Sequence, residues 1–201
     1  MIRNIIFDLG NVLLYFKPDE FLLQYTQDKD YIQEFISKVI RSEIWLKLDR
    51  GTISLKKAEN EFLRQFPEDH NLIRIFFEHW TEMLTPINDN VKILQDLKSN
   101  GYNIYILSNF IKEAFDIMRN KYKFLSLFDG KIISSYEQVI KPELEIYQRL
   151  IIKYGLIPEE CIFIDDIPPF LSHARKLGMK TILFLPKTDL RLELCKFGVN
   201  V

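Results

Sequence analysis

The sequence has only two cysteines, Cys161 and Cys195, which lie far apart and lack the spacing of metal ligands. Disulfide bonds are not expected, and 201 residues can bury a sizeable core without them. No apolar run approaches the ~20 residues that a membrane-spanning helix needs. The apolar run in the opening MIRNIIFDLG is too short for a signal peptide. We therefore expect a cytoplasmic protein with no membrane partner.

The chain also lacks an excess of either charge, because 27 Lys and Arg residues stand against 28 Asp and Glu residues. This balance offers no attraction for a nucleic-acid backbone, so nucleic acid is not an expected partner. A composition of 47% hydrophobic and 13% aromatic residues excludes a disordered chain. No internal repeat or low-complexity segment is present. We expect a globular protein, a monomer or a homodimer, that binds a small molecule.

Short apolar strands alternate with helices over most of the chain. Strands are expected at 3–8, 103–107, 131–134, 161–164 and 181–184, with helices at 87–100, 111–122, 142–154 and 168–177. Such alternation predicts a parallel sheet with both faces covered. Between residues 18 and 84 the apolar residues instead recur at helical spacing, without strand-like alternation. We predict an α/β protein: a doubly wound, Rossmann-like core of residues 1–16 and 87–201, with a helical-bundle cap, residues 17–86, inserted in it.

Polar residues that carry chemistry follow several of the predicted strands. They are Asp8, the pair Ser108 and Asn109, Lys141, and the pair Asp165 and Asp166. The ligand crevice of an open parallel sheet lies beyond the carboxyl ends of its strands, so these side chains are expected to converge. Taken singly, each has an ordinary structural explanation in a turn or at a helix start. Their combination favours a functional site.

The combination of a carboxylate nucleophile, a hydroxyl, an ammonium and a carboxylate pair suits a magnesium-assisted phosphoryl transfer. Asp8 is expected to attack phosphorus and form an aspartyl phosphate. Mg²⁺ prefers hard oxygen ligands, which Asp8 with Asp165 or Asp166 would supply. Lys141 would neutralise the charge on Asp8 and phosphate, while Ser108 and nearby backbone N–H groups would hold phosphate oxygens.

Four segments of the chain, in order, resemble the motifs of the haloacid dehalogenase-like hydrolases. They are Phe7-Asp8-Leu9-Gly10-Asn11-Val12-Leu13, Leu107-Ser108-Asn109, Lys141-Pro142 and Phe163-Ile164-Asp165-Asp166. Within that family the chain is similar to the subgroup of bacterial α-D-glucose-1-phosphate phosphatases and the phosphatase half of soluble epoxide hydrolase. The resemblance implies a phosphatase that acts on a small phosphorylated metabolite. It implies Asp8 as nucleophile, Ser108, Asn109 and Lys141 as phosphate contacts, and Asp8, Asp165 and Asp166 with the Gly10 carbonyl as Mg²⁺ ligands.

Two positions depart from the wider family pattern. Most of its phosphatases carry a second aspartate two positions after the nucleophile, where this chain has Gly10. That aspartate serves as general acid and base, a contribution of typically ~10²–10⁴-fold that is lost here unless a cap residue or water substitutes. We therefore expect a substrate with an acidic leaving group, such as a sugar 1-phosphate or an acyl phosphate. The second departure is Phe170, where relatives commonly have asparagine.

Two other functions remain open. A haloacid dehalogenase would use Asp8 to displace halide without metal, although the pair Asp165 and Asp166 would repel its anionic substrate. A catalytically silent binding protein with this fold is the other alternative. The segment from Trp45 to Gly51 is a weaker candidate for substrate contact, in which Trp45, Lys47 or Arg50 would touch the sugar or a second anion.

Overall fold

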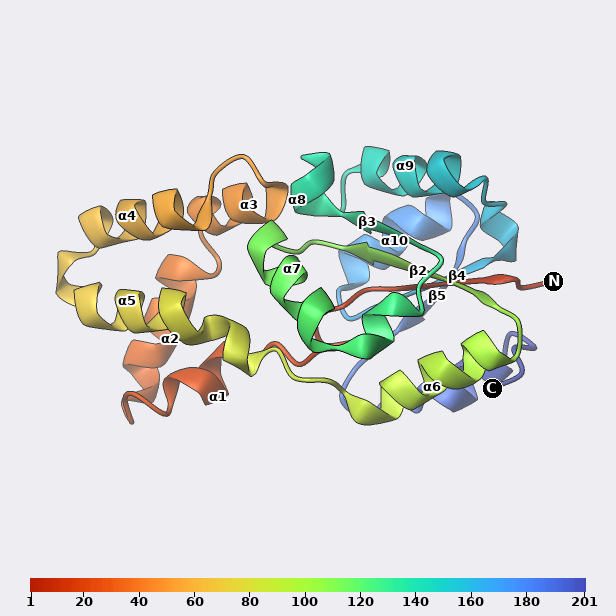
Figure 1. The fold of residues 1–201 in the computed structure, drawn as a ribbon, viewed down its shortest axis with the longest axis horizontal. Coiled ribbons are helices and arrows are strands. Elements are labelled where there is room, and N and C mark those ends of the chain that lie inside the picture. Colours follow the sequence, from red (N-terminus) through yellow and green to blue (C-terminus); the bar gives the residue numbers. More distant parts are fainter.

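The computed structural model describes residues 1–201 and contains one five-stranded parallel sheet (Figure 1). The strands are short and apolar, and they occur in the order β3-β2-β1-β4-β5 across the sheet. Their bounds are β1 Asn4–Phe7, β2 Asn103–Ser108, β3 Gly130–Ile133, β4 Cys161–Asp165 and β5 Lys180–Leu183. The predicted doubly wound α/β architecture is confirmed.

Helices cover both faces of the sheet. One face packs against α9, Leu144–Tyr154, and α10, Pro168–Lys176. The opposite face packs against α6, Asn88–Ser99, α7, Lys112–Lys121, and α11, Leu190–Cys195 (Figure 1). Successive strand residues point to opposite faces, so Ile5 and Phe7 join one apolar cluster while Ile6 joins the other. The three inner strands, β1, β2 and β4, are therefore buried on both faces, which explains their nearly continuous apolar sequences, whereas the edge strands β3 and β5 are only partly buried.

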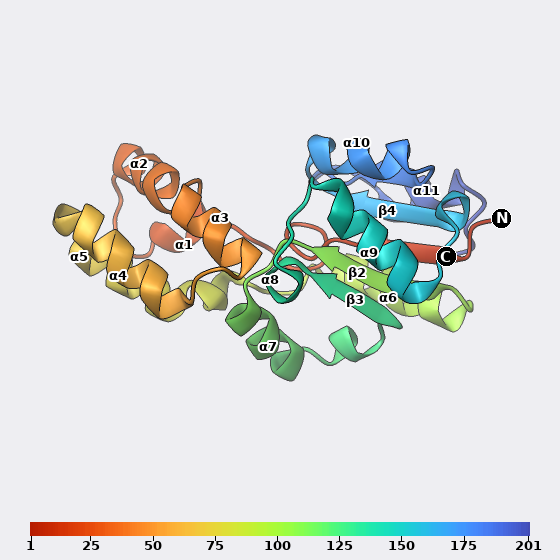
Figure 2. The ribbon, with the colours of Figure 1, turned by 90° about the horizontal axis from the view of Figure 1, so that it is seen from above.

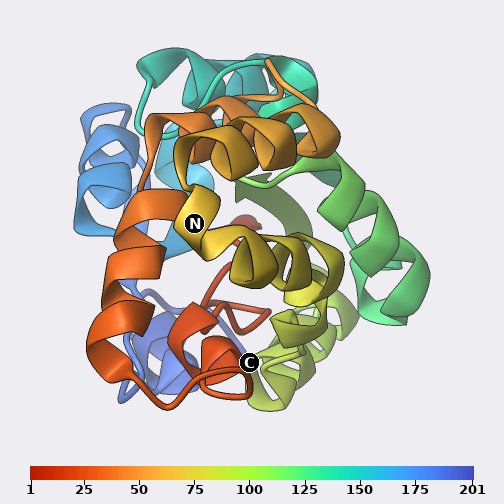
Figure 3. The same cartoon turned by 90° about the vertical axis from the view of Figure 1, so that its left-hand side faces the viewer.

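Five helices lie between β1 and α6 in the chain and are gathered beside the sheet (Figures 1 and 2). They are α1 Pro18–Leu22, α2 Lys29–Val39, α3 Glu43–Arg50, α4 Leu55–Gln65 and α5 His70–His79. Asp28, Ser42 and Ser54 cap the starts of α2, α3 and α4 through side-chain oxygens. Figure 3 views this group from its outer side, in front of the sheet. Its apolar residues join the same cluster as one sheet face.

Two short helices were not expected from the sequence, α8 at Ser134–Glu137 and α11. Because α8 begins at Ser134, strand β3 ends at Ile133, one residue earlier than predicted. The Ser134 hydroxyl donates to the Asp49 carbonyl and the Ser135 hydroxyl donates to the Phe110 carbonyl. These long-range bonds stabilise a turn that local sequence does not specify. No helix combines the length and the apolar composition needed to cross a membrane.

The order of the strands determines where the site lies. Strand β1 is central, with β2 and β3 on one side and β4 and β5 on the other. The chain therefore crosses over β1 between β3 and β4, and ligands bind at such switch points, beyond the carboxyl ends of the strands. Residues that follow β1 and β4 flank this point directly.

Candidate active site

Asp8 follows β1, and its backbone N–H donates to the Ile164 carbonyl of β4 at 2.9 Å. Its carboxylate is almost completely buried. The Lys141 ammonium, which is fully buried, lies 3.0 Å from Asp8 Oδ1 and 2.6 Å from Asp165 Oδ2. Burial acts to lower the pKa of Lys141, but Asp8 and Asp165 outweigh it, so the pKa is raised. The lysine is thus a fixed positive charge between two carboxylates.

Three carboxylates converge at this end of the sheet. One oxygen from each of Asp8, Asp165 and Asp166 lies within 4.8 Å of the others. With one ammonium among them, the ionised cluster carries two excess negative charges. Burial accordingly raises the pKa of Asp165 to about 7 against the opposing effect of Lys141. Burial, followed by the charge of Asp8, also raises the pKa of Asp166.

The two adjacent aspartates have different partners. Both oxygens of Asp165 are engaged, Oδ2 by Lys141 Nζ and Oδ1 by the Ile167 N–H at 2.8 Å. Asp166 instead lines the pocket and accepts one hydrogen bond, at 3.1 Å from Asn11 Nδ2. Asn11 has φ of 52°, a left-handed conformation that asparagine tolerates, and its Oδ1 accepts from the Phe16 N–H. Asn11 thus orients Asp166, a role that the sequence analysis missed.

The end of β2 contributes residues with two distinct environments. Ser108 is fully buried and its hydroxyl has no hydrogen-bond partner, but it does not line the pocket. It also does not cap α7, which begins without a side-chain cap. Asn109 lines the pocket, but both atoms of its amide bind the backbone of Lys141, at 2.7 Å and 3.0 Å. The lining of the pocket therefore includes Asp8, Gly10, Asn109, Lys141 and Asp166 of the expected set.

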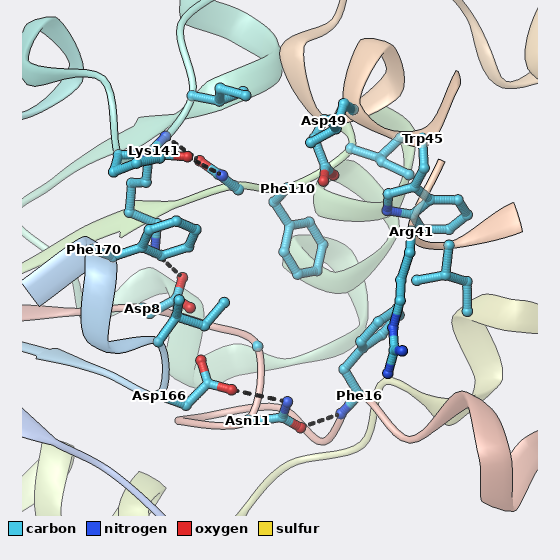
Figure 4. Close-up of a pocket in the computed structure, with 18 of the residues that line it drawn as sticks. Asp8, Asn11, Phe16, Arg41, Trp45, Asp49, Phe110, Lys141, Asp166 and Phe170 are labelled. Atoms are coloured by element: carbon cyan, nitrogen blue, oxygen red, sulfur yellow. Dashed lines mark hydrogen bonds and ion pairs between the residues drawn. The ribbon is translucent and has the colours of Figure 1, made fainter. Parts of the chain in front are cut away.

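The pocket has a volume of about 560 Å³ and is open to solvent (Figure 4). Asp8, Lys141 and Asp166 lie along one side of it, and Trp45, Asp49 and Arg41 lie along the other. Eleven of its twenty lining residues are hydrophobic: Phe16, Ile40, Trp45, Leu46, Trp80, Leu84, Phe110, Ile111, Ile140, Ile167 and Phe170. The Phe170 ring centroid is 4.9 Å from Lys141 Nζ, so this position shields the lysine.

The segment from Trp45 to Gly51 reaches the pocket through one of the three expected residues, Trp45, and through one that was not expected, Asp49. Trp45 lines it, whereas Lys47 does not and Arg50 forms a bidentate pair with Glu143. The carboxyl group of Asp49 lies in the pocket. Burial, followed by the charge of Asp8, raises the pKa of Asp49 to about 7, while Lys141 acts in the opposite direction. The sequence analysis named this segment but missed Asp49.

A family model described as haloacid dehalogenase-like hydrolase matches residues 2–178. The chain belongs to this family, as its four ordered motifs indicated. The sesquiterpene phosphatase astK of Aspergillus oryzae is 28% identical over 174 residues, which are 87% of this chain and 85% of that protein.

Solved structures with the same fold are similar over nearly the whole chain. A haloacid dehalogenase-family enzyme from Bacteroides thetaiotaomicron, in complex with magnesium and inorganic phosphate, has a TM-score of 0.77 and 21% identity, covering 96% of this chain and 99% of that one. The L-2-haloacid dehalogenase from Xanthobacter autotrophicus, with chloropropionic acid covalently bound, has a TM-score of 0.68 and 19% identity. The match covers 100% of this chain and 85% of that one. At these identities the likeness shows the fold alone.

Proposed function

We propose that this hydrolase cleaves phosphate monoesters of small organic molecules, with Asp8 as the nucleophile. The observation that carries this proposal is the buried Asp8 carboxylate, which is paired with Lys141 and lines an open pocket beside Asp166. A phosphatase that works through a covalent aspartyl phosphate needs a carboxylate nucleophile and fixed positive charge beside it. The likeness to astK, which is named a phosphatase, supports the same reaction class.

The donor set fits a Mg²⁺ ion. Asp8 Oδ1 is buried without a hydrogen bond, although it is close to Lys141, and the carboxylate cluster has two excess negative charges when all three groups are ionised. Hard oxygens and a net charge of this size suit a divalent cation. Asp8, Asp166 and the Gly10 carbonyl would hold it, and Asp165 would contribute mainly by fixing Lys141. When bound, Mg²⁺ would supply positive charge to the transferring phosphoryl group.

The reaction of these residues has two steps. An Asp8 oxygen bonds to phosphorus and the bond to the leaving-group oxygen breaks, which gives an aspartyl phosphate. Water then attacks phosphorus, and the electron pair of the broken bond returns to the Asp8 carboxylate. Lys141 keeps its charge throughout and stabilises both the attacking carboxylate and the phosphoryl oxygens. Asn109 and Asp165 hold the two ends of Lys141 in this position.

We also assign separate roles to two parts of the chain. Residues 1–16 and 87–201 are the catalytic core, and residues 17–86 are a cap that closes the side of the pocket opposite Asp8. Trp45 of the cap lies on that side and packs against Trp80, which also lines the pocket, while Lys141 and Asp166 of the core lie on the other side. A cap over the crevice excludes water and selects the substrate.

The lining of the pocket favours a substrate whose organic part has substantial apolar surface. Eleven hydrophobic lining residues can bury such a group, and each Å² of apolar surface buried contributes ~25 cal/mol. A sugar 1-phosphate, the sequence-based expectation, has a polar organic part and would bury less apolar surface against this lining. The name of astK, a sesquiterpene phosphatase, agrees with a more apolar substrate.

The dehalogenase alternative uses the same nucleophile without metal. The fold is shared with a dehalogenase, so fold alone does not separate the two reactions. The two excess negative charges of the ionised cluster, Asp8 included, would repel a haloacid carboxylate, whereas a divalent cation would offset them. A silent binding protein, the other alternative, would have no chemical need for the buried set of Asp8, Lys141, Asp165 and Asp166.

The test is phosphate release from geranyl phosphate, glucose 1-phosphate, glucose 6-phosphate and acetyl phosphate, with Mg²⁺ and with EDTA. We expect release that requires Mg²⁺ and is abolished in Asp8→Asn. Asp30→Asn, at an exposed position of α2, is the matched control and keeps wild-type activity. Halide release from 2-chloropropionate in EDTA, without phosphate release, would instead establish a dehalogenase. No turnover of any substrate would favour the binding protein.

A further inference from the structure

The pocket lacks a carboxylate two positions after Asp8, where Gly10 stands. Cleavage of an ordinary phosphate monoester needs a proton for the leaving oxygen, and the second step needs a base for the attacking water. Three carboxyl groups line the pocket, those of Asp8, Asp49 and Asp166. Asp8 is the proposed nucleophile, and Asp166 is bound by Asn11 within the cluster that fits a metal. Asp49 is the remaining carboxyl group.

Asp49 faces the site from the opposite element. Figure 4 shows its carboxyl group entering the pocket from α3, across from Asp8 and Asp166. Asp49 is half-buried, and its carboxyl group forms no hydrogen bond or ion pair with another side chain. A leaving oxygen departs on the side of phosphorus opposite the attacking carboxylate. A carboxyl group across the pocket from Asp8 is therefore on the side where the proton is needed.

The backbone around Asp49 is fixed to the sheet side of the molecule by three consecutive residues. The Ser134 hydroxyl donates to the Asp49 carbonyl at 2.5 Å. Arg50 pairs with Glu143 through both guanidinium nitrogens. At Gly51 an added Cβ would lie 2.2 Å from the Ser135 carbonyl oxygen, so only glycine permits this approach. These contacts hold Asp49 at a constant place relative to Asp8, as acid–base catalysis requires.

The electrostatic surroundings of Asp49 suit proton transfer near neutral pH. Its pKa is raised to about 7, so protonated and ionised forms coexist there. The other charged side chains that line the pocket are Arg41, Lys141, Asp8 and Asp166. Helices α4 and α8, which pack against α3, contribute no titratable side chain to the lining. The unpartnered carboxyl group is therefore not neutralised by a dedicated cation.

We infer that Asp49 is the general acid and base of the reaction, in place of the residue absent at Gly10. This inference rests on the proposed phosphatase function. In the first step the Asp8–phosphorus bond forms, the bond from phosphorus to the leaving oxygen breaks, and that oxygen takes the proton of Asp49. In the second step the Asp49 carboxylate takes a proton from water as the water oxygen bonds to phosphorus and Asp8 is released. Each cycle returns the proton to Asp49.

The test compares substrates that differ in their need for a proton. Asp49→Asn keeps the size of the side chain and the backbone bond to Ser134. With a primary alkyl phosphate we expect kcat/KM to fall by ~10²–10⁴-fold. With acetyl phosphate, whose leaving group is a weak base, kcat/KM should change less than about tenfold because departure needs no proton. Acetyl phosphate should also give a burst and a trapped aspartyl phosphate, because the base of the second step is missing.

The pH profile supplies a second readout. The wild-type kcat/KM for the alkyl phosphate should fall as pH rises through about 7, since only protonated Asp49 can donate, and this decline should be absent in Asp49→Asn. Equal loss for both substrates would show a binding or structural role and overturn the inference, as would no loss for either. Failure of the phosphatase proposal itself would give a different result. Wild-type protein would then release no phosphate from any substrate, and the Asp8→Asn variant would not differ from it.

Discussion

The side-chain amide of Asn109 binds both backbone polar groups of Lys141, the N–H and the carbonyl. Its Oδ1 accepts from the Lys141 N–H at 2.7 Å, and its Nδ2 donates to the Lys141 carbonyl at 3.0 Å. The end of β2 is thereby joined to the loop that carries the only cation in the carboxylate cluster. Asn109 was expected to contact phosphate, but both polar atoms of its side chain bind the backbone of Lys141, the residue whose ammonium we propose to contact phosphate.

Removal of these two hydrogen bonds should reduce both the catalytic rate and the stability of the fold. In Asn109→Ala the two backbone groups of Lys141 lose their partners, which costs about 1–3 kcal/mol of unfolding free energy. We expect kcat to fall about tenfold or more because the ammonium is no longer fixed against Asp8. Urea unfolding and phosphate release measure the two effects. Asn100→Ala, which loses one exposed hydrogen bond, is the control, and equal effects in both variants would contradict the prediction.

Lys141 should be indispensable to the fold as well as to the chemistry. Lys141→Met leaves Asp8 and Asp165 as uncompensated buried charges, which should reduce the unfolding free energy by about 3–5 kcal/mol. Adding Asp165→Asn to Lys141→Met should recover part of this loss but no activity. Lys98→Met breaks a partly exposed pair with Asp129 and should cost about 1 kcal/mol or less. A Lys141→Met protein as stable as this control would refute the assignment.

Mg²⁺ should stabilise the folded protein independently of turnover. A ligand present at 100 times its dissociation constant stabilises by about 2.7 kcal/mol, so the melting temperature should rise with Mg²⁺ concentration. The rise should vanish in Asp166→Asn, which removes a pocket-facing ligand, and persist in Asp116→Asn, which changes a half-buried carboxylate on α7 outside the pocket. An equal rise in both variants would place the ion elsewhere.

The raised pKa of Asp49 makes a prediction about stability and pH. Its pKa is about 7 when folded and near ~3.9 when unfolded, so between these values the folded protein binds the extra proton. Stability from this group therefore decreases as pH rises from 4 to 7. Asp49→Asn avoids the loss and should be about 1–3 kcal/mol more stable than wild type at pH 8, with little difference near pH 4. Urea unfolding at both values checks this, and lower stability of the variant at pH 8 would contradict it.

The sequence predicts those parts of the site that follow strands. Asp8, Asp165 and Asp166 end strands of a parallel sheet, and the carboxyl ends of such strands share one edge, so their meeting follows from secondary structure alone. The alternation of short apolar strands with helices likewise determines the class of fold. Lys141 is separated from β3 by α8, but its place in the motif order was sufficient to include it.

Residues whose role depends on docking between distant elements were not predictable in this way. Asp49 lies on an amphipathic helix whose apolar stripe, with Ile44 and Leu48, indicates packing but not what the polar face meets. Its place in the pocket depends on contacts of Asp49 and Gly51 with Ser134 and Ser135. These two serines belong to α8, a short helix that was not predicted from the sequence. The hydrogen bonds of Asn109 likewise connect segments more than 30 positions apart.

A variant with a new carboxyl group at position 10 tests whether the missing proton donor is what limits the Asp49→Asn enzyme. An added Cβ at Gly10 meets no atom within 4 Å, and its φ is outside the left-handed region, so a side chain fits there without strain. In the Asp49→Asn background, Gly10→Asp should restore turnover of a primary alkyl phosphate by at least about tenfold, because a carboxyl group again lies near the leaving oxygen. Gly10→Asn has the same shape but cannot exchange the proton, so it should restore nothing. Recovery with asparagine, or none with aspartate, would contradict the idea that a missing proton donor limits the Asp49→Asn enzyme.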